Sequence, residues 1–157
     1  MRRIRLSDYT VTTLAGQTGL AGTTDGIGQA ATLPAIIGMG YDFRYLYLPD
    51  SGSQVIRRVD VVTARVDTIA GQLATTGAND GPASSATFNS PRGAASDGVN
   101  VYIGAYNNNR IRVINTLTWQ VSSLATFPAA ALEGNLAIIQ NAIFAADFSG
   151  ATIKRID

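Results

Sequence analysis

The sequence predicts an all-β protein assembled from repeated antiparallel units, and three observations support this fold class. The chain repeats itself, since "VTTLAGQ" at 11–17 returns as "VDTIAGQ" at 66–72. Within each repeat, short runs of β-branched and aromatic residues alternate with turn-forming residues. The charged residues are almost all Arg and Asp, with one Lys and one Glu. Because Lys and Glu favour surface helices and Asp favours turns, this composition is typical of a loop-rich β protein.

Length and composition indicate one domain without thiol or imidazole chemistry. The chain has 157 residues, of which 46% are hydrophobic and 15% are charged, enough apolar material for one core. It contains no Cys and no His, which excludes disulfides, zinc sites and His-based catalysis. A metal would have to be a hard cation bound by oxygens, and we expect neither a metal site nor a cofactor.

No segment of the sequence resembles a membrane span. No apolar run approaches the roughly 20 residues that cross a bilayer, and the opening "MRRIRLSDYT" lacks the apolar core of a signal peptide. We therefore expect no membrane partner, and either a cytosolic protein or a targeting segment outside the given chain. The absence of Cys and of any N-x-Ser/Thr acceptor favours the cell interior.

The internal repeat is a duplication. Aligning residues 11–65 with 66–120 without a gap gives sixteen identical pairs, against about four expected by chance. A third, shortened copy follows, in which residues 141–157 realign with 44–60. The phrase "IRLSD" at 4–8 is interpreted as the same strand as "IRRVD" at 56–60.

Each repeat is predicted to hold four short antiparallel strands, which for the second repeat lie at 91–96, 101–105, 110–115 and 120–125. Four strands in a period of this length are typical of β-propeller blades. A helix across 128–147 is the alternative for the third copy, but Gly134 interrupts it and the alignment predicts two strands. We expect one domain spanning 1–157, with a strand pair at 4–16 and blade units at 17–71, 72–126 and 127–157.

The second repeat resembles the NHL-repeat β-propellers. The letters that carry the resemblance are "VDTIAG", the Asp80-Gly81 pair, "ATFNSPRGAASD" and "NVYIGAYNNNRIRVI". The resemblance implies four-stranded blades in a ring of about six, with the strand after "P.G" lining the centre and "V.TLAG" outermost. The chain departs from the pattern at position 105, where Ala replaces the Asp that ends the second strand.

About three blades do not close such a ring. If each open blade face is of order 500–1,000 Å², leaving it in water forgoes roughly 10–25 kcal/mol, more than the typical stability of a domain, about 5–15 kcal/mol. We therefore expect the ring to be completed by the rest of a longer chain, by a second copy, or by the blades of another protein.

The loop "AYNNNR" and its surroundings are the candidate partner-binding site. Its turn is expected to share a rim with the long loops 17–33 and 72–90, because they lie at the same end of the strands. An exposed Tyr beside amides and Arg suits a peptide partner or base stacking. The candidate residues are Tyr106, Asn107, Asn108, Asn109, Arg110 and Arg92.

Several recurrent residues have structural interpretations. A basic residue at the second position of each third strand is expected to pair with Asp50 or Asp147, the basic series being Arg5, Arg57, Arg112 and Lys154. The Asp25-Gly26 and Asp80-Gly81 pairs are interpreted as turns. Trp119 is expected to pack at a blade edge, and three further residues are expected in the core or at closure: Phe127, Pro128 and Phe148.

The sequence is compatible with three functions. The first is a non-catalytic scaffold that binds a protein through loops on one face. The second is RNA binding, which some NHL propellers perform, but a net charge of +1 gives little attraction to RNA. The third is a propeller-type hydrolase or lyase, for which the inner strands offer only Asp42, Asp97 and Glu133.

Overall fold

Alternating apolar residues form the strands of the second repeat in the computed structural model, which describes residues 1–128, 132–147 and 150–157. The side chains of Val101, Ile103 and Ala105 point into the core from one strand. The four predicted strands of this repeat are confirmed within one residue at each end: β9 (Pro91–Ser96), β10 (Asn100–Ala105), β11 (Arg110–Asn115) and β12 (Gln120–Thr126).

The first repeat forms an equivalent antiparallel sheet, so the all-β fold class is confirmed. Its inner strand is short, and the three that follow are six residues each. Tyr47 of the first repeat and Tyr102 of the second lie at the same position of the second strand, opposite Arg58 and Val113 respectively. The strands are β4 (Gly40–Tyr41), β5 (Tyr45–Asp50), β6 (Val55–Asp60) and β7 (Arg65–Ala70).

Each of these sheets has five strands, one more than the sequence predicts. The extra strand is very short and follows the Asp of an Asp-Gly pair: β3 (Gly26–Ile27) pairs with β7, and β8 (Gly81–Pro82) pairs with β12. The "V.TLAG" strand is therefore not outermost. The long loop that precedes each sheet folds back and covers the outer edge of that sheet. Local sequence patterns do not predict this tertiary pairing.

The remaining strands form two smaller sheets at the chain ends. The third copy is a three-stranded sheet of β13 (Leu132–Ile139), β14 (Ala142–Asp147) and β15 (Thr152–Ile156). The two-strand interpretation of its first part is thus confirmed over the helical alternative. At the other end, β1 (Arg2–Ile4) pairs with β2 (Val11–Thr13).

The N-terminal strand is not the one that the sequence comparison placed there. Ile4 pairs with Val11, as Val59 pairs with Val66 in the first five-stranded sheet. The hairpin is therefore related to that sheet by the same shift that relates the two complete repeats, and "IRLSD" is not the counterpart of "IRRVD". Both segments alternate apolar and basic residues, so the sequence alone did not distinguish the alignment of 4–8 with 56–60 from the one that the structure shows.

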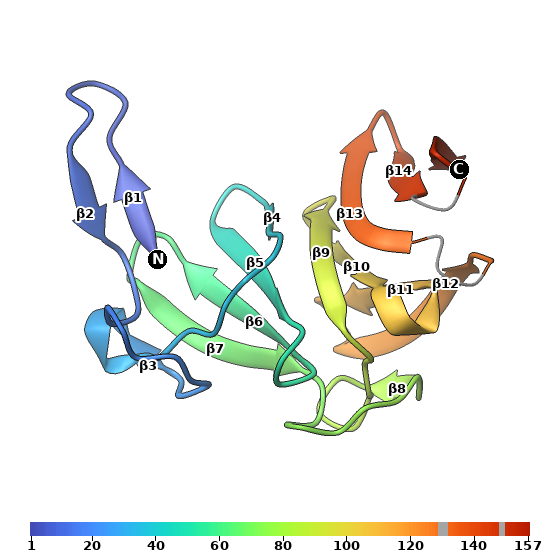
Figure 1. Cartoon of the computed structure of the whole chain (residues 1–157), viewed down its shortest axis with the longest axis horizontal. Coiled ribbons are helices and arrows are strands. Elements are labelled where there is room, and N and C mark those ends of the chain that lie inside the picture. The colour runs from blue at the N-terminus through green and yellow to red at the C-terminus, as the bar shows by residue number, and fades with distance from the viewer. Residues whose placement is uncertain (129–131, 148–149) are drawn as a thin grey trace.

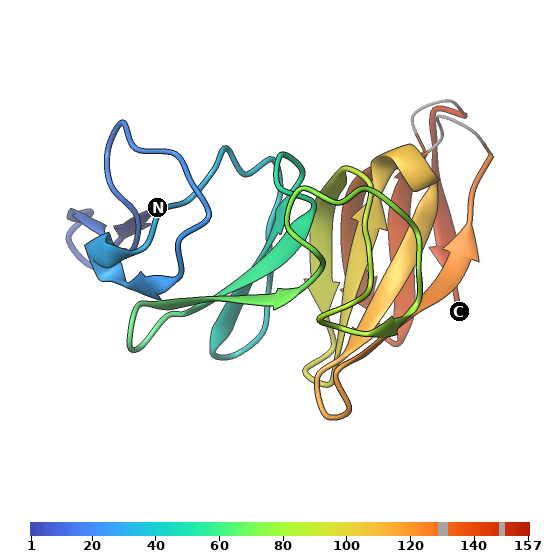
Figure 2. The same cartoon turned by 90° about the horizontal axis from the view of Figure 1, so that it is seen from below.

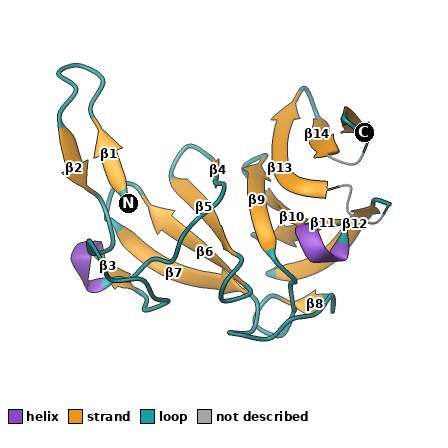
Figure 3. Cartoon of the chain, viewed as in Figure 1, coloured by secondary structure: helices purple, strands orange, loops and turns teal. Residues whose placement is uncertain are grey.

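The four sheets follow one another in chain order along an open arc (Figure 1). Figure 3 shows that the arc is built almost entirely of strands and loops. Within the described residues the helices are two short 3₁₀ turns, η1 (Gly28–Ala30) and η2 (Tyr106–Asn108), and neither has the length or hydropathy of a membrane span.

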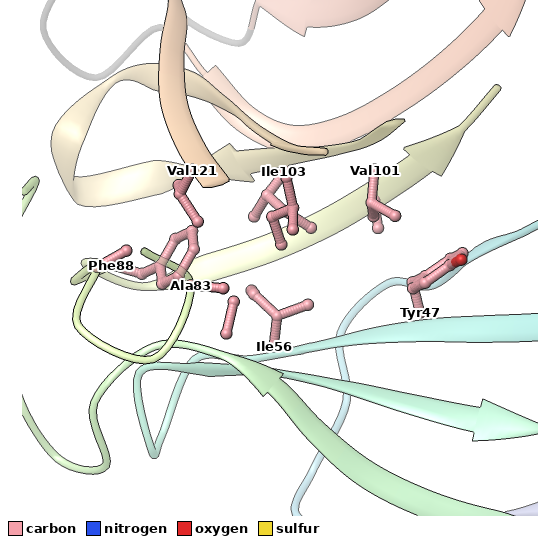
Figure 4. Close-up of a cluster of buried hydrophobic side chains, with 11 residues drawn as sticks. Tyr47, Ile56, Ala83, Phe88, Val101, Ile103 and Val121 are labelled. Atoms are coloured by element: carbon pink, nitrogen blue, oxygen red, sulfur yellow. The ribbon is translucent and has the colours of Figure 1, made fainter. Parts of the chain in front are cut away.

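The core lies between neighbouring sheets. Between the two five-stranded sheets, Ile56 faces Ile103 and Val101, and Phe88 of the preceding loop fills one end (Figure 4). Phe88 and Ile103 are fully buried. Further clusters join the N-terminal pair to the first sheet, and the second sheet to the third copy. Each sheet therefore gains stability by packing against its neighbours.

Adjacent sheets approach too closely for side chains at three glycines, which lie on β4, β9 and β10. A Cβ on Gly40 would lie 2.6 Å from the Ala94 carbonyl carbon. On Gly93 or Gly104 it would collide with the backbone of Gly134, which itself has a φ of 94°. Glycine is required here because only it permits such backbone contact between adjacent sheets.

Apolar side chains remain exposed on and around β4 and at both ends of the arc. From residue 37 to residue 43, exposed side chains alternate with more buried ones, as in an extended segment with one face in solvent. Among the exposed residues are Ile37, Met39, Tyr41 and Phe43 on and beside β4, Ile4, Leu6 and Val11 at the N-terminal end, and Ile153 at the C-terminal end.

Candidate interaction surface

The η2 turn is shaped by the run of three asparagines. Tyr106–Asn108 form one 3₁₀ turn, and Asn109 closes it with a φ of 49° while its N–H donates to the Tyr106 carbonyl at 3.1 Å. Asn adopts this left-handed conformation more readily than other residues with side chains. The turn therefore projects Tyr106 from the junction of β10 and β11 in a fixed conformation.

Side-chain amides fasten this turn to the loop 72–90. Asn107 Nδ2 donates to Ser90 Oγ at 2.8 Å, and Asn108 Nδ2 donates to the Gly77 carbonyl at 2.7 Å. The Tyr106 N–H donates to the Ser90 carbonyl. The predicted convergence of this turn with the loop 72–90 is seen, but two of the three amides bind the protein itself. These two amides hold the turn in place, a role that the sequence of the repeats does not indicate.

Arg92 and Tyr106 form the polar and aromatic part of the surface. The Arg92 guanidinium carbon lies 3.5 Å from the centre of the Tyr106 ring, a close cation–π contact. Both residues are half-buried, as is Arg110 at the start of β11. Figure 2 shows η2 at the upper edge of the molecule, at the opposite end of the strands from the β11–β12 hairpin.

The basic residues of the third strands pair with different partners from those expected. Arg57 is fully buried, and its Nη2 lies 2.8 Å from Asp25 Oδ1. Arg112 is equally buried, with Asp80 Oδ1 at 2.7 Å. Asp50 instead accepts a bond from the Ser53 N–H in its own turn.

The ends of the predicted basic series behave differently. Lys154 lies 3.7 Å from Asp147 as expected, but it is half exposed. The Arg5 guanidinium pairs with Asp8, three residues further along the chain. The true counterpart of Arg57 at the N-terminus is Arg2, which occupies the same register position of its strand pair.

The Asp-Gly turns are ion-pair sites that fasten the long loops to the sheets. Arg112 also donates to the carbonyls of Thr87 and Asn79, at 2.8 and 2.9 Å. Asp80 in turn accepts bonds from the Ser123 N–H and hydroxyl on β12. Burial lowers the pKa of Arg112, an effect that the Asp80 carboxylate opposes. The sequence identified the turns but not these partners, because each pair joins segments far apart in the chain.

The inner-strand carboxylates organise turns. Asp42 accepts bonds from the Tyr47 hydroxyl at 2.7 Å and the Tyr45 N–H at 2.7 Å. Asp97 does the same with the Tyr102 hydroxyl and the Asn100 N–H. Partial burial alone would raise the pKa of each carboxyl, but these hydrogen bonds outweigh it and the pKa is lowered. The side chain of Glu133 lies outside the described residues.

A cavity of about 520 Å³ opens beside these turns, on the inner face of the arc. It is lined mainly by apolar and small residues of three successive sheets, among them Met39, Phe43, Ala94 and Ile138. In the described part of the chain, no three acidic residues come together as a metal site would require.

The residues expected to pack at a blade edge or in the core are divided between core and surface. Trp119 lies at the β11–β12 turn, 38% exposed, with the Arg58 guanidinium 5.8 Å from its ring. It therefore contacts the neighbouring sheet, as expected for a blade-edge residue. Phe127 packs against the cluster at the third copy, whereas Pro128 is exposed. Phe148 lies outside the described residues.

Comparison with known proteins supports the resemblance. No family model matches the chain. The human NHL repeat-containing protein 2 is 33% identical over 110 residues, which are 68% of this chain. The chain is a distant homologue of the NHL-repeat β-propeller proteins. It spans only 15% of the length of that relative.

Solved structures show the same fold for this NHL-type chain. An auxiliary nutrient binding protein from Bacteroides thetaiotaomicron aligns with a TM-score of 0.71 and 14% identity, over 99% of this chain and 42% of that one. A chain of the nidogen/laminin complex aligns with a TM-score of 0.63 and 19% identity, over 98% and 52%. The chain thus covers only part of larger propeller-containing proteins.

Proposed function

We propose that this NHL-type chain is a non-catalytic module that binds a protein partner through the η2 surface, defined by Arg92, Tyr106, Asn107 and Arg110. The observation that carries the proposal is the Arg92–Tyr106 contact at 3.5 Å on a turn fastened by side-chain amides. Arg and Tyr are frequent anchors of protein interfaces. A turn already held in place loses little conformational entropy on binding.

The carboxylates of the inner strands support a non-catalytic role. Asp42 and Asp97 each accept several hydrogen bonds within their own turn, and their lowered pKa values keep them ionised at neutral pH. A general acid at neutral pH requires a raised pKa instead. Both residues are therefore better suited to holding the hairpins than to transferring protons.

RNA binding is the alternative, favoured by one feature of the same surface. A Tyr ring beside Arg suits base stacking. Only two of the six candidate residues are cationic, however, and the whole chain carries a net charge of +1. Because phosphate neutralisation supplies most of the affinity of nucleic-acid binders, a protein partner agrees better with this charge.

The module is proposed to act within a closed ring. Exposed apolar side chains at both ends of the arc, such as Ile4, Val11 and Ile153, support completion by the rest of a longer chain or by a second copy. The mass of the protein in solution tests this. A stable, well-folded monomer at 16.4 kDa would contradict the need for completion.

Site-specific photo-crosslinking tests the binding surface in the natural host. A benzophenone amino acid is placed at Tyr106 or, as a control, at Val62, which is 79% exposed on the β6–β7 turn at the opposite end of the strands. We expect a discrete protein adduct from position 106 only, weakened by Arg92→Ala. Equal adducts from both positions, or an adduct that nuclease removes, would reject the protein-binding proposal.

A further inference from the structure

The β1–β2 hairpin has the same register as the strand pairs β6–β7 and β11–β12 of the two five-stranded sheets. Arg2 pairs with Thr13. One repeat length further along the chain, Arg57 pairs with Thr68, and one more repeat length further, Arg112 pairs with Ser123. The apolar pair Ile4–Val11 likewise recurs as Val59–Val66 and Ile114–Val121.

In both five-stranded sheets this position binds an Asp-Gly turn. Arg57 donates to the carbonyls of Thr32 and Thr24 and to Asp25 Oδ1, at 2.9, 3.0 and 2.8 Å. Asp25 also accepts from the Thr68 N–H and hydroxyl. The next residues continue as β3, which pairs with β7. Arg112 and Asp80 repeat this arrangement, with β8 on β12.

At the N-terminal hairpin the same position is open. Arg2 is exposed and donates to the hydroxyls of Thr13 and Thr18, at 2.7 and 3.4 Å. Ile4 and Val11 are 59% and 58% exposed, whereas their counterparts in the two five-stranded sheets are 0–2% exposed. Arg2 thus donates to the hydroxyl of Thr13. The equivalent hydroxyl in the first five-stranded sheet, that of Thr68, donates to the Asp25 carboxylate instead.

We propose that the β1–β2 hairpin is a docking site for the Asp-Gly turn of a further blade unit. The Asp carboxylate and the carbonyl of the residue before it bind the Arg2 guanidinium, and the Gly and the next residue pair with Val11 and Thr10. These positions correspond to those where β3 meets Val66 and Arg65. Burial of the guanidinium requires this set of acceptors, because an unpaired buried charge is strongly unfavourable.

A second copy of the chain does not supply this turn. Its Asp25 and Asp80 already bind its own Arg57 and Arg112, so docking in trans would break a buried pair to form an equivalent one. The occupant is therefore a further segment of the same chemistry: a carboxylate, a Gly, and an extended small or apolar residue. This inference rests on the proposed completion of the arc and specifies what binds at one end of it.

A peptide titration tests the site. The probe is a synthetic peptide with the sequence of residues 19–33, "GLAGTTDGIGQAATL", added to the isotope-labelled chain and followed by amide NMR shifts. We expect shifts confined to β1, β2 and the residues packed on them. Replacing the peptide Asp by Asn, or Arg2→Gln in the protein, should weaken binding about tenfold or more, since both remove charge-assisted hydrogen bonds.

The matched control is Arg3→Gln. Arg3 corresponds to Arg58, which pairs with Asp67 and contacts neither Asp-Gly turn, so this variant should bind like the parent chain. Equal affinity for the Asp and Asn peptides, shifts outside the hairpin region, or no binding at millimolar peptide would overturn the proposal. So would sedimentation showing a dimer that Arg2→Gln dissociates. None of these results depends on the η2 surface, so failure here is distinguishable from failure of the crosslinking test.

Discussion

Substitution of Asp80 by Ala tests how the long loops are fastened to the sheets. The Asp80 carboxylate is bound by the Arg112 guanidinium and by the N–H and hydroxyl of Ser123. Removing one partner of a fully buried pair costs about 3–5 kcal/mol, and an exposed pair contributes about 0–1 kcal/mol. The Arg112 side chain is 0% exposed and that of Asp80 is 49% exposed. We therefore expect an intermediate loss of about 2–3 kcal/mol in the free energy of unfolding.

Urea unfolding followed by circular dichroism measures this loss, and thermal unfolding should show a decrease in Tm of about 4–12 °C. The control is Asp67→Ala, because Asp67 on β7 pairs with Arg65 and Arg58, neither of which is fully buried. That variant should lose less than about 1 kcal/mol. Equal losses for the two variants would show that the Asp-Gly turn is an ordinary surface turn, and the reasoning would be wrong.

Three further changes test the packing and the charges of the sheets. Gly93→Ala should lower the stability by about 1–3 kcal/mol or more, because its Cβ would meet the Gly134 backbone; Gly52→Ala, with no contact nearer than 3.5 Å, is the control in the same urea assay. Phe88→Ala should cost about 3–5 kcal/mol because the ring is fully buried between the sheets, with Phe88→Leu much milder; equal effects would count against a packed interface. The N–H of Thr63 and the Arg44 guanidinium lower the pKa of Asp60 to about 2. Its contribution is present above the unfolded pKa near 3.8 and is lost as the pH falls towards 2, so an Asp60→Asn variant should show a flatter acid-unfolding curve between these values.

The local structure of the sheets was predictable from the sequence. The strands of the second repeat lie within one residue of their predicted positions because alternation of apolar residues directly sets which faces are buried. The turn at Tyr106–Asn109 was also predictable, since Asn tolerates the left-handed conformation that closes it. The Arg92–Tyr106 contact was suggested only as a convergence of two segments, and its geometry required the fold.

The sequence alone determined the repeat, the strands and the turns, because these depend on contacts between residues close in the chain. Only the tertiary structure decided which Asp neutralises each buried Arg, how the two short edge strands cover the sheets, and which N-terminal Arg is equivalent to Arg57. Arg57 and Asp25 are 32 residues apart, and a spacing pattern cannot distinguish Asp25 from the nearer Asp50. That choice follows from the loop folding back over β7, where burial of the guanidinium requires several acceptors at once.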